Sequence, residues 1–402
     1  MQYKVLFKRC LLAIVVMFVV TSLQAQREMK TINDNWEFRK SIDESWESVN
    51  LPHTFNIDAY QQRNYYQGKG FYRRTLVLPE IVAERRYYMK IDAASKAANI
   101  RVNGKEVGSH VGGYTACIVD ITEYIRKENL IEITVDNGRK DITPISADST
   151  FWGGIYRDVW LISTPKQHFN MSNMGSDGIF ISTPVVNEKR GVLKVKCEVT
   201  NDSHESSILE VRSAIYSPQG KLLQTIKQKQ KLKSGETYIF ENTSGAIESP
   251  DLWSPETPSL YLVKTTLVDP KSGKLLDEKN HKVGFRWFTF DGSKGFFLNG
   301  KSYKLRGLNR HQDQAPAGVA LDDEAHRRDI FLMKELGCNF IRISHFPQDD
   351  AILEMCDELG LLAWEEIPII NIVPNTPGYD DNCEYNLREM IRQHYNHSSV
   401  IT

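Results

Sequence analysis

The chain has 402 residues and a formal net charge of −1, and 41% of its residues are hydrophobic and 25% charged. This length exceeds one ordinary domain, so we expect two to four. The near-neutral charge and the scattered lysines and arginines exclude the strongly basic surface that a nucleic-acid or anionic-membrane partner would need.

The first 25 residues have the pattern of an export signal. Lys4, Lys8 and Arg9 precede an unbroken apolar run from Leu11 to Val20, and the stretch ending at Ala25 offers a small-residue cleavage site. Ten apolar residues are too few to span a bilayer, which takes about 20. We therefore predict a signal peptide at 1–25, with a retained anchor as the alternative, no membrane partner, and an exported protein, either periplasmic or secreted.

The cysteines that follow the export signal show neither a disulfide framework nor a metal-binding pattern. They are five, an odd number, widely spaced and without a Cys-x-x-Cys pair: Cys117, Cys197, Cys338, Cys356 and Cys383. This arrangement favours buried free thiols over a metal site.

Residues 27–165 read as an all-β sandwich of the jelly-roll type. Ile100–Val102, the Asn103-Gly104 turn and Glu106-Val107 form a hairpin pattern, and Ile131–Val135 alternates with period two. Val159–Ile162 is the last predicted strand. Short strands between Gly, Asn and Asp turns, without a long helix, favour this architecture.

Residues 170–284 alternate more regularly and predict an immunoglobulin-like sandwich of about seven short strands. In one strand the apolar positions are Leu193, Val195, Cys197 and Val199, with Lys194, Lys196, Glu198 and Thr200 expected to face solvent. The runs 209–215 and 261–267 repeat this pattern and end in turn sequences.

Strands alternate with helices from 286 to 402, which predicts part of a (β/α)₈ TIM barrel. The expected strands are Tyr303–Leu308, Phe340–Ile343, Leu361–Trp364 and one beginning at Val400. The expected helices are Asp322–Leu336, Asp349–Leu359 and Cys383–His394. In the first helix the predicted apolar face comprises Ile330, Leu332, Met333 and Leu336.

Polar residues follow three consecutive barrel strands, where the active site of such a barrel lies. The first strand leads into Asn309 and His311, the second into His345, and the third into Glu365 and Glu366. Each residue alone has a structural explanation, such as a helix cap or an ion pair. Their coincidence at three strand ends favours a binding site.

These stretches resemble the β-galactosidase and β-glucuronidase family, glycoside hydrolase family 2. The barrel motifs are Gly307–Asp313 and Arg342–Pro347. In the upstream sandwiches the matching stretches are 70–74, 102–104, 110–114, 152–159, 252–256 and 284–286. These stretches occur in the family's order along the whole mature chain. The residues at 310–313 and 364–368 resemble the galactosidase branch of the family more than the glucuronidase branch.

The resemblance implies an exo-acting retaining β-glycosidase with a sugar substrate and two catalytic carboxyl groups about 5–5.5 Å apart. The family carries its acid/base residue in a stretch whose lead-in matches 396–402, so we expect no catalytic glutamate within this chain. Glu365 and Glu366 are adjacent on a strand and point to opposite faces, so they cannot form the pair.

What remains is substrate binding. His311 and His345 resemble residues that hydrogen-bond sugar hydroxyls, and Asp148 matches a sandwich aspartate that reaches the barrel. Asn309 and Glu366 are weaker candidates that would support the others. The magnesium site of some galactosidases does not carry over to Pro368–Ile372, so we expect no metal and no cofactor.

Several alternatives stay open. The substrate is a β-galactoside in the preferred interpretation, with β-glucuronides, β-mannosides and other β-glycosides as alternatives, and an oligomer is compatible with the sequence. An alternative from another functional class is that the chain is an inactive fragment that binds carbohydrate. Coding sequence downstream of Thr402 would distinguish a truncated enzyme from such a fragment.

Overall fold

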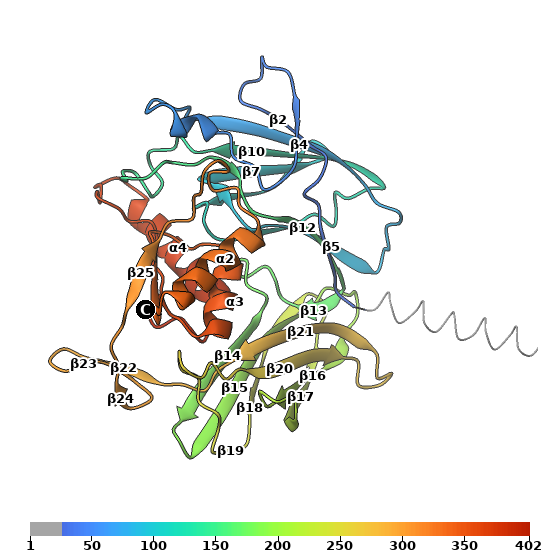
Figure 1. Ribbon diagram of the computed structural model, residues 1–402. Helices are drawn as coiled ribbons and strands as arrows, with labels where there is room; N and C mark the ends of the chain where they lie inside the picture. The colour runs from blue at the N-terminus through green and yellow to red at the C-terminus, as the bar shows by residue number, and fades with distance from the viewer. Residues whose placement is uncertain (1–25) are drawn as a thin grey trace, which may run out of the picture.

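The computed structural model describes residues 26–402, and the predicted signal peptide at 1–25 lies outside this part. Two β-sandwiches flank a helical third module. Figure 1 shows the N-terminal sandwich in blue to green and the second in green to yellow, with the orange-to-red third module between them on one side. The third module can therefore be held from both sides.

The first sandwich, the jelly-roll module, packs a six-stranded sheet on a four-stranded sheet. The larger sheet has the order β3 (Glu47–Val49), β2 (Trp36–Arg39), β4 (Lys69–Val77), β10 (Glu128–Asp136), β7 (Ala97–Val102), β8 (Lys105–Val111). The smaller has the order β1 (Glu28–Thr31), β12 (Val159–Pro165), β5 (Arg85–Ile91), β9 (Cys117–Asp120), and β6 (Ala94–Ser95) pairs with β11 (Gly154–Ile155).

Alternation along the strands places the core between these sheets. In β10, Ile131, Ile133 and Val135 are buried while the residues between them are partly exposed. The predicted hairpin is present as β7 and β8, and Asn103 and Gly104 at its turn both have positive φ. These rigid sheets carry the loops that reach the third module.

The second sandwich, the immunoglobulin-like module, has a five-stranded and a four-stranded sheet. The first contains β13 (Gln167–Phe169), β15 (Arg190–Asn201), β14 (Ile179–Val186), β18 (Glu236–Thr243) and β19 (Ile247–Glu248). The second has the order β17 (Leu222–Leu232), β16 (Ser207–Tyr216), β20 (Tyr261–Val268), β21 (Leu275–Val283).

One part of the predicted alternation in β15 is wrong. Glu198 and Thr200 were expected to face solvent, but both are buried. Glu198 accepts hydrogen bonds from Asn173 and from Arg392 of the third module, and Thr200 hydrogen-bonds Thr237. The third module and the loop around Asn173 cover this end of the sheet, which strand periodicity alone could not predict.

The third module, the barrel segment, begins with a small antiparallel sheet of β22 (Phe288–Asp291), β23 (Gly295–Leu298) and β24 (Lys301–Ser302). Three parallel strands follow in the order β25 (Gly307–Arg310), β26 (Phe340–Ile343), β27 (Leu362–Trp364). The helices are α2 (Asp323–Glu335), α3 (Asp350–Leu359) and α4 (Tyr379–Gln393). Val400 forms a parallel bridge to Ala363, as expected for the start of a fourth strand.

Two sequence predictions for the barrel segment need correction. The first parallel strand starts at Gly307, not Tyr303, because Tyr303 donates its backbone N–H to Phe296 and extends the antiparallel sheet. In α2, Ile330 and Met333 are buried, but Leu332 is 44% and Leu336 75% exposed. Leu332 and the C-cap residue Leu336 are four residues apart and lie on a second face, which is partly exposed to solvent.

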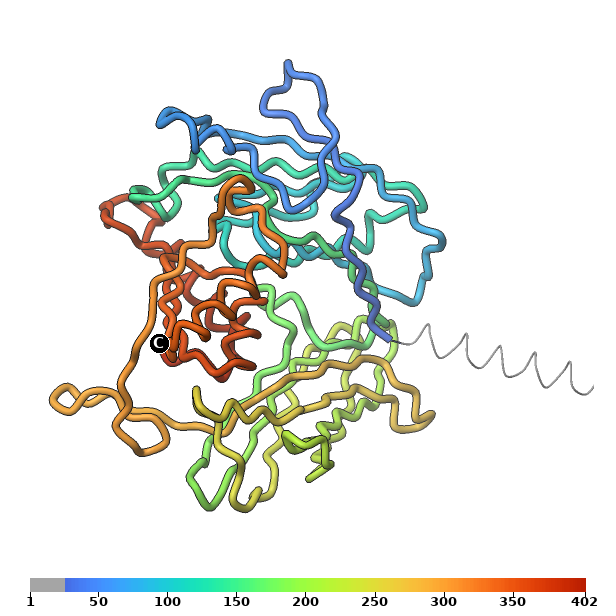
Figure 2. Tube along the Cα trace, in the orientation of Figure 1, coloured from blue at the N-terminus to red at the C-terminus, as the bar shows by residue number. Residues whose placement is uncertain are grey.

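The start of the described chain also connects modules. Figure 2 shows the dark-blue segment running from the jelly-roll module towards the immunoglobulin-like module. There Arg27 forms an ion pair with buried Asp277 of β21, with 2.7 Å between Nη2 and Oδ2. A buried, doubly hydrogen-bonded pair of this kind fixes the two sandwiches relative to each other.

Candidate active site

The carboxyl ends of the three parallel strands meet at one edge of the barrel segment. His311 follows β25, His345 follows β26, and Glu366 follows β27. The parallel register sets Asn309 opposite Arg342 and Arg342 opposite Trp364. Side chains from distant parts of the sequence are thereby brought to one rim, as in other barrels of this type.

Glu366 is the centre of this rim. Its Oε1 lies 2.7 Å from His345 Nδ1 and 2.8 Å from Arg342 Nη2. A carboxylate only accepts hydrogen bonds, so His345 Nδ1 carries the proton and donates it to Glu366. This fixes the histidine's tautomer and leaves Nε2 as an acceptor for a hydroxyl donor.

His311 completes the group of predicted rim residues. Its ring centroid lies 5.3 Å from that of His345 in an edge-on arrangement with an interplanar angle of 74°. The structure therefore brings His311, His345 and Glu366 together, and Arg342 joins them. The sequence did not predict Arg342 as a site residue, although it is a charged residue inside the otherwise apolar strand Phe340–Ile343.

A cavity of about 540 Å³ opens beside these residues. The polar residues lining it are Arg342, His345, Glu365, Glu366 and Asn371, and the apolar ones are Ile367, Ile369, Ile370, Leu387 and Met390. An apolar wall with a few convergent polar groups is typical of small-molecule sites of this size.

Asp148, on a loop of the jelly-roll module, contacts Asn371, which lines this cavity. Asn371 Nδ2 donates a hydrogen bond of 3.3 Å to Asp148 Oδ1. The loop bearing Asp148 also docks on the barrel segment through Thr143, whose hydroxyl donates to the Pro368 carbonyl. Asn371 was missed by sequence reasoning, because nothing local distinguishes it from other loop asparagines.

Asn309 stands apart from the other predicted residues. It is exposed on β25, and no described residue forms a hydrogen bond with its side chain that would hold it at the rim. Asn309 therefore pairs with Arg342 through the strand register, but its side chain does not join the hydrogen bonds around Glu366.

Glu365 points away from Glu366 into the protein. Its side chain is 2% exposed, and both oxygens lie 2.9 Å from His394 Nδ1. Burial alone would lower the pKa of the His394 imidazole, but the Glu365 and Asp350 carboxylates raise it to about 10. His394 is therefore a buried cation that holds Glu365 behind the rim.

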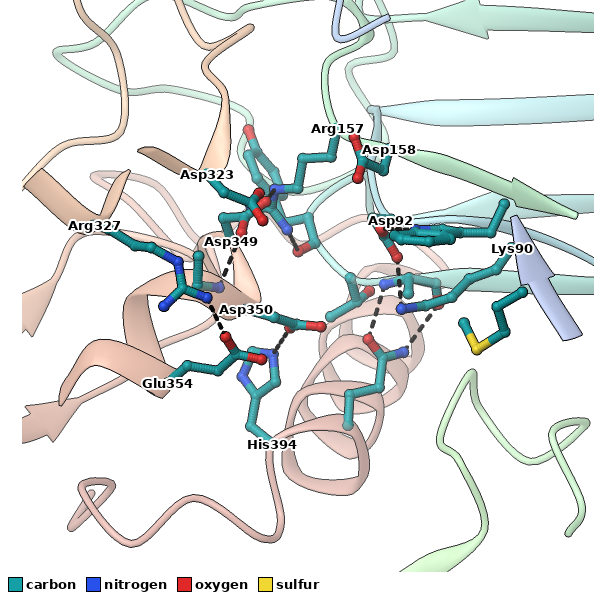
Figure 3. A pocket seen from close by; sticks show the side chains of 17 residues that line it. Lys90, Asp92, Arg157, Asp158, Asp323, Arg327, Asp349, Asp350, Glu354 and His394 are labelled. Atoms are coloured by element: carbon teal, nitrogen blue, oxygen red, sulfur yellow. Dashed lines mark hydrogen bonds and ion pairs between the residues drawn. The ribbon is translucent and has the colours of Figure 1, made fainter. Parts of the chain in front are cut away.

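A second cavity, the junction pocket, lies between the jelly-roll module and the barrel segment and has a volume of about 330 Å³ (Figure 3). Six carboxylates line it: Asp92, Asp158, Asp323, Asp349, Asp350 and Glu354. The cationic residues Lys90, Arg157, Arg327 and His394 also line it. The pocket is therefore highly charged and rich in oxygen ligands.

Burial, reinforced by neighbouring carboxylates, makes ionisation harder for two of these groups, Asp349 and Asp323. Burial raises the pKa of Asp349 to about 6 despite the nearby Arg157 guanidinium. The pKa of Asp323 is raised by burial and by the charge of Asp158. A bound cation would relieve this repulsion and lower both pKa values.

Within residues 26–402, no group of three or more His, Cys, Asp or Glu side chains is arranged to hold a metal ion. The junction pocket therefore supplies hard oxygen donors, but its side chains do not form a complete coordination shell for a metal ion.

Among the described residues, no helix is long and apolar enough to cross a membrane.

Three family descriptions match consecutive parts of the chain. Residues 13–165 match the sugar binding domain of glycosyl hydrolases family 2, residues 177–286 match glycosyl hydrolases family 2, and residues 291–402 match its TIM barrel domain. The chain belongs to glycosyl hydrolase family 2. This confirms the resemblance and the three-module architecture.

Individual members of glycosyl hydrolase family 2 are similar over nearly the whole chain. The crystal structure of Bacteroides uniformis β-glucuronidase matches this chain with a TM-score of 0.91 and 58% sequence identity. The match covers 94% of this chain and 46% of the Bacteroides uniformis chain. A second structure is described as a calcium binding mutant of Bacteroides uniformis β-glucuronidase 2, in which two aspartates 26 positions apart are replaced by alanine. It has 58% sequence identity and a TM-score of 0.89, and the match covers 94% of this chain and 47% of that chain.

A β-galactosidase of Thermoanaerobacterium thermosulfurigenes is 34% identical over 93% of this chain and 53% of its own length. The chain spans about half the length of the curated relatives it matches. Glucuronidases are more similar than galactosidases among these relatives, so the galactosidase interpretation of the sequence is less favoured.

Proposed function

We propose that this chain forms the sugar-binding half of an exo-acting β-glucuronidase that retains anomeric configuration. The observation that carries the proposal is the 58% identity to Bacteroides uniformis β-glucuronidase, which includes all three modules. Galactosidase relatives are more distant, with 34% identity in the example above. The fold alone does not distinguish a β-glucuronide substrate from a β-galactoside, because both kinds of enzyme in the family share this fold.

The rim residues have a definite task in this proposal. His345 accepts a sugar hydroxyl at Nε2 because Glu366 holds its Nδ1 proton, and His311 offers a second imidazole beside it. Asp148, oriented by Asn371, accepts hydrogen bonds from sugar hydroxyls. These groups bind and orient the sugar for the two-step displacement of the family.

The test is a comparison of substrates in a protein that carries this chain together with a complete barrel. We expect kcat/KM for p-nitrophenyl β-D-glucuronide to exceed that for the β-D-galactoside by roughly tenfold or more, because a built polar site discriminates strongly. Equal or higher activity on the galactoside would restore the galactosidase interpretation. Activity on neither would refute the proposal.

We further infer export, since residues 1–25 have the signal pattern described above. N-terminal sequencing of protein from the periplasm or medium should begin near residue 26. A protein found in the cytoplasm with an intact first residue would contradict this.

We also infer that the junction pocket binds calcium. Asp323 and Asp349 both line it and lie 26 positions apart, as do the two aspartates altered in the calcium-binding mutant of the Bacteroides uniformis enzyme. The donor chemistry fits, because Ca²⁺ takes carboxylate, carbonyl and water oxygens. Asp158 approaches from the jelly-roll side of the same pocket, so a bound ion would join two modules.

Calorimetric titration of the chelator-treated chain with CaCl₂ tests this inference. We expect one site in the wild type and none in Asp323→Ala or Asp349→Ala. At one hundred times Kd, calcium should add about 2.7 kcal/mol to the free energy of unfolding. Glu324→Ala removes an equal charge beside Asp323 but outside the pocket, so it should bind normally. No heat and no stabilisation in the wild type would disprove the site.

A further inference from the structure

The loop that carries Asp148 has almost no regular structure. It runs from Gly138, after β10, to Phe151, before β11, and contains neither a helix nor a strand. A loop of this length needs side-chain anchors to hold one conformation, because ordering each backbone residue costs about 1–2 kcal/mol.

Lys96 supplies the most concentrated of these anchors. Its ammonium Nζ donates to the carbonyls of Arg139 and Pro144 at 2.7 Å each, and lies 3.5 Å from the carbonyl of Ile142. The same nitrogen lies 4.9 Å from the ring centroid of Phe151. One cation thus contacts both the first half and the last residue of the loop.

The backbone of Lys96 is itself held within the jelly-roll module. Its N–H donates to the Asp136 carbonyl at the end of β10, and its carbonyl accepts from Gly112. The residue is 4% exposed, so its ammonium has exchanged water for loop carbonyls. An ammonium has three donors and no acceptor, which matches a nest of carbonyl oxygens.

The charged groups around Lys96 are few. Burial and the Arg139 guanidinium lower the pKa of its ammonium, Asp136 and Asp141 act in the opposite direction, and the result is a pKa of about 8. Asp141 forms an ion pair with Arg139, which reduces the influence of both. The Lys96 charge therefore changes within a pH range that a hydrolase experiences in assays.

We propose that Lys96 is the positioning residue of the active site: its ammonium gathers the loop 138–151 and so places Asp148 over the barrel rim. The proposal rests on the assignment of Asp148 to substrate binding. Thr143 holds the same loop against the barrel segment at Pro368, and Asn371 orients the carboxylate at the tip. On the jelly-roll side, Tyr65 and Asn137 hydrogen-bond the backbone of Phe151 at the end of the loop, and Lys96 holds the carbonyls of its first half.

Limited trypsin digestion of the 402-residue chain tests the anchoring directly. Arg139 and Lys140 are exposed cleavage sites inside the loop, and Lys271 is exposed in a turn of the immunoglobulin-like module, far from the loop. We expect Lys96→Met to raise the ratio of loop cleavage to Lys271 cleavage by about tenfold, because the loop opens more often. An unchanged ratio would overturn the proposal.

The wild type gives the same test without a substitution. Between pH 7 and 9.5 the ammonium becomes an amine with one donor fewer, so the cleavage ratio should rise several-fold. Lys96→Arg keeps its charge across this range and should lose the pH dependence. Trypsin's own pH dependence cancels in the ratio. A flat wild-type ratio would overturn the proposal even if the methionine variant failed to fold.

Steady-state kinetics of a protein with a complete barrel test whether the position of the loop affects the active site. Lys96→Met should lower kcat/KM for the glucuronide about as much as Asp148→Ala, and the double variant should be no worse than either single one. Wild-type kinetics in Lys96→Met would refute the positioning role. Failure of the proposed function is distinct: the wild type would then hydrolyse no glucuronide, whatever the digestion shows.

Discussion

At the scale of single residues, and within the part of the chain that the structure describes, the predicted site divides into three hydrogen-bonded residues, His311 with a ring contact only, and Asn309 with neither. His345 and Glu366 are hydrogen-bonded to each other, and Asp148 is bonded to Asn371. Asn309 is exposed beside them. Substitutions should therefore have graded effects that follow these contacts.

In a protein with a complete barrel, we expect His345→Ala and Asp148→Ala each to lower kcat/KM by roughly tenfold or more. Each lost hydrogen bond to a bound hydroxyl is worth about 1–3 kcal/mol. Asn309→Ala should stay within about threefold of the wild type and is the control. Steady-state kinetics decide the matter, and an effect of Asn309 as large as that of His345 would contradict the contact-based ranking.

His394 leads to a prediction about stability and pH. His394→Ala leaves Glu365 buried without its cation, which should lower the free energy of unfolding by about 3–5 kcal/mol. The folded-state pKa is raised from 6.5 to about 10, so the pair's contribution is complete below pH 6.5 and is lost as pH rises through 10. Urea unfolding at pH 7 and 10.5 measures both. His204→Ala, at an exposed histidine, should change neither value.

At the scale of elements, helix α4 docks on the jelly-roll module through one buried carboxylate. Glu389 accepts hydrogen bonds from His110 Nε2 at 3.0 Å and from Thr115 Oγ1 at 2.7 Å, and its side chain is 2% exposed. Four residues further along, Gln393 bonds both the N–H and the carbonyl of Ala116. This face of α4 is therefore committed to the module interface.

Glu389→Ala should loosen that interface by leaving His110 and Thr115 unpaired, at a cost of about 1–3 kcal/mol for each buried group. Amide exchange should accelerate in α4 while β10, in the jelly-roll core, keeps its protection. Glu384→Ala, at an exposed position on the same helix, serves as the control. Equal acceleration in β10 would mean that the modules unfold as one unit.

At the scale of the whole molecule, the two glutamates that follow the third parallel strand do not form a pair suited to glycoside hydrolysis. Glu365 is buried against His394, and Glu366 forms an ion pair with Arg342 and accepts a hydrogen bond from His345. We therefore expect the 402-residue chain alone to hydrolyse neither aryl β-glucuronides nor aryl β-galactosides. Turnover that disappears when one of these two glutamates becomes glutamine would contradict this expectation. A protein with a complete barrel is the positive control.

Strand periodicity and turn residues determined most of the architecture. Alternation in β10 and β20 and the Asn-Gly turn after β7 predicted both sandwiches, and strand–helix alternation predicted the barrel segment. These features depend on local backbone geometry and on burial of one face, which neighbouring residues in the sequence encode. The rim histidines were also predictable, because parallel strands bring their carboxyl ends to one edge.

Only the tertiary structure decided which polar residues are buried and what they contact. Glu198 lies on the predicted solvent face of its strand yet is buried and bonded to Arg392 of another module, and Glu365, adjacent to Glu366, contacts His394 instead of the rim. The junction pocket gathers Asp158, Asp323 and Asp349 from two modules. Lys96 holds a loop that begins more than 40 residues later in the chain. Such contacts depend on how modules dock, and local sequence patterns carry no information about docking.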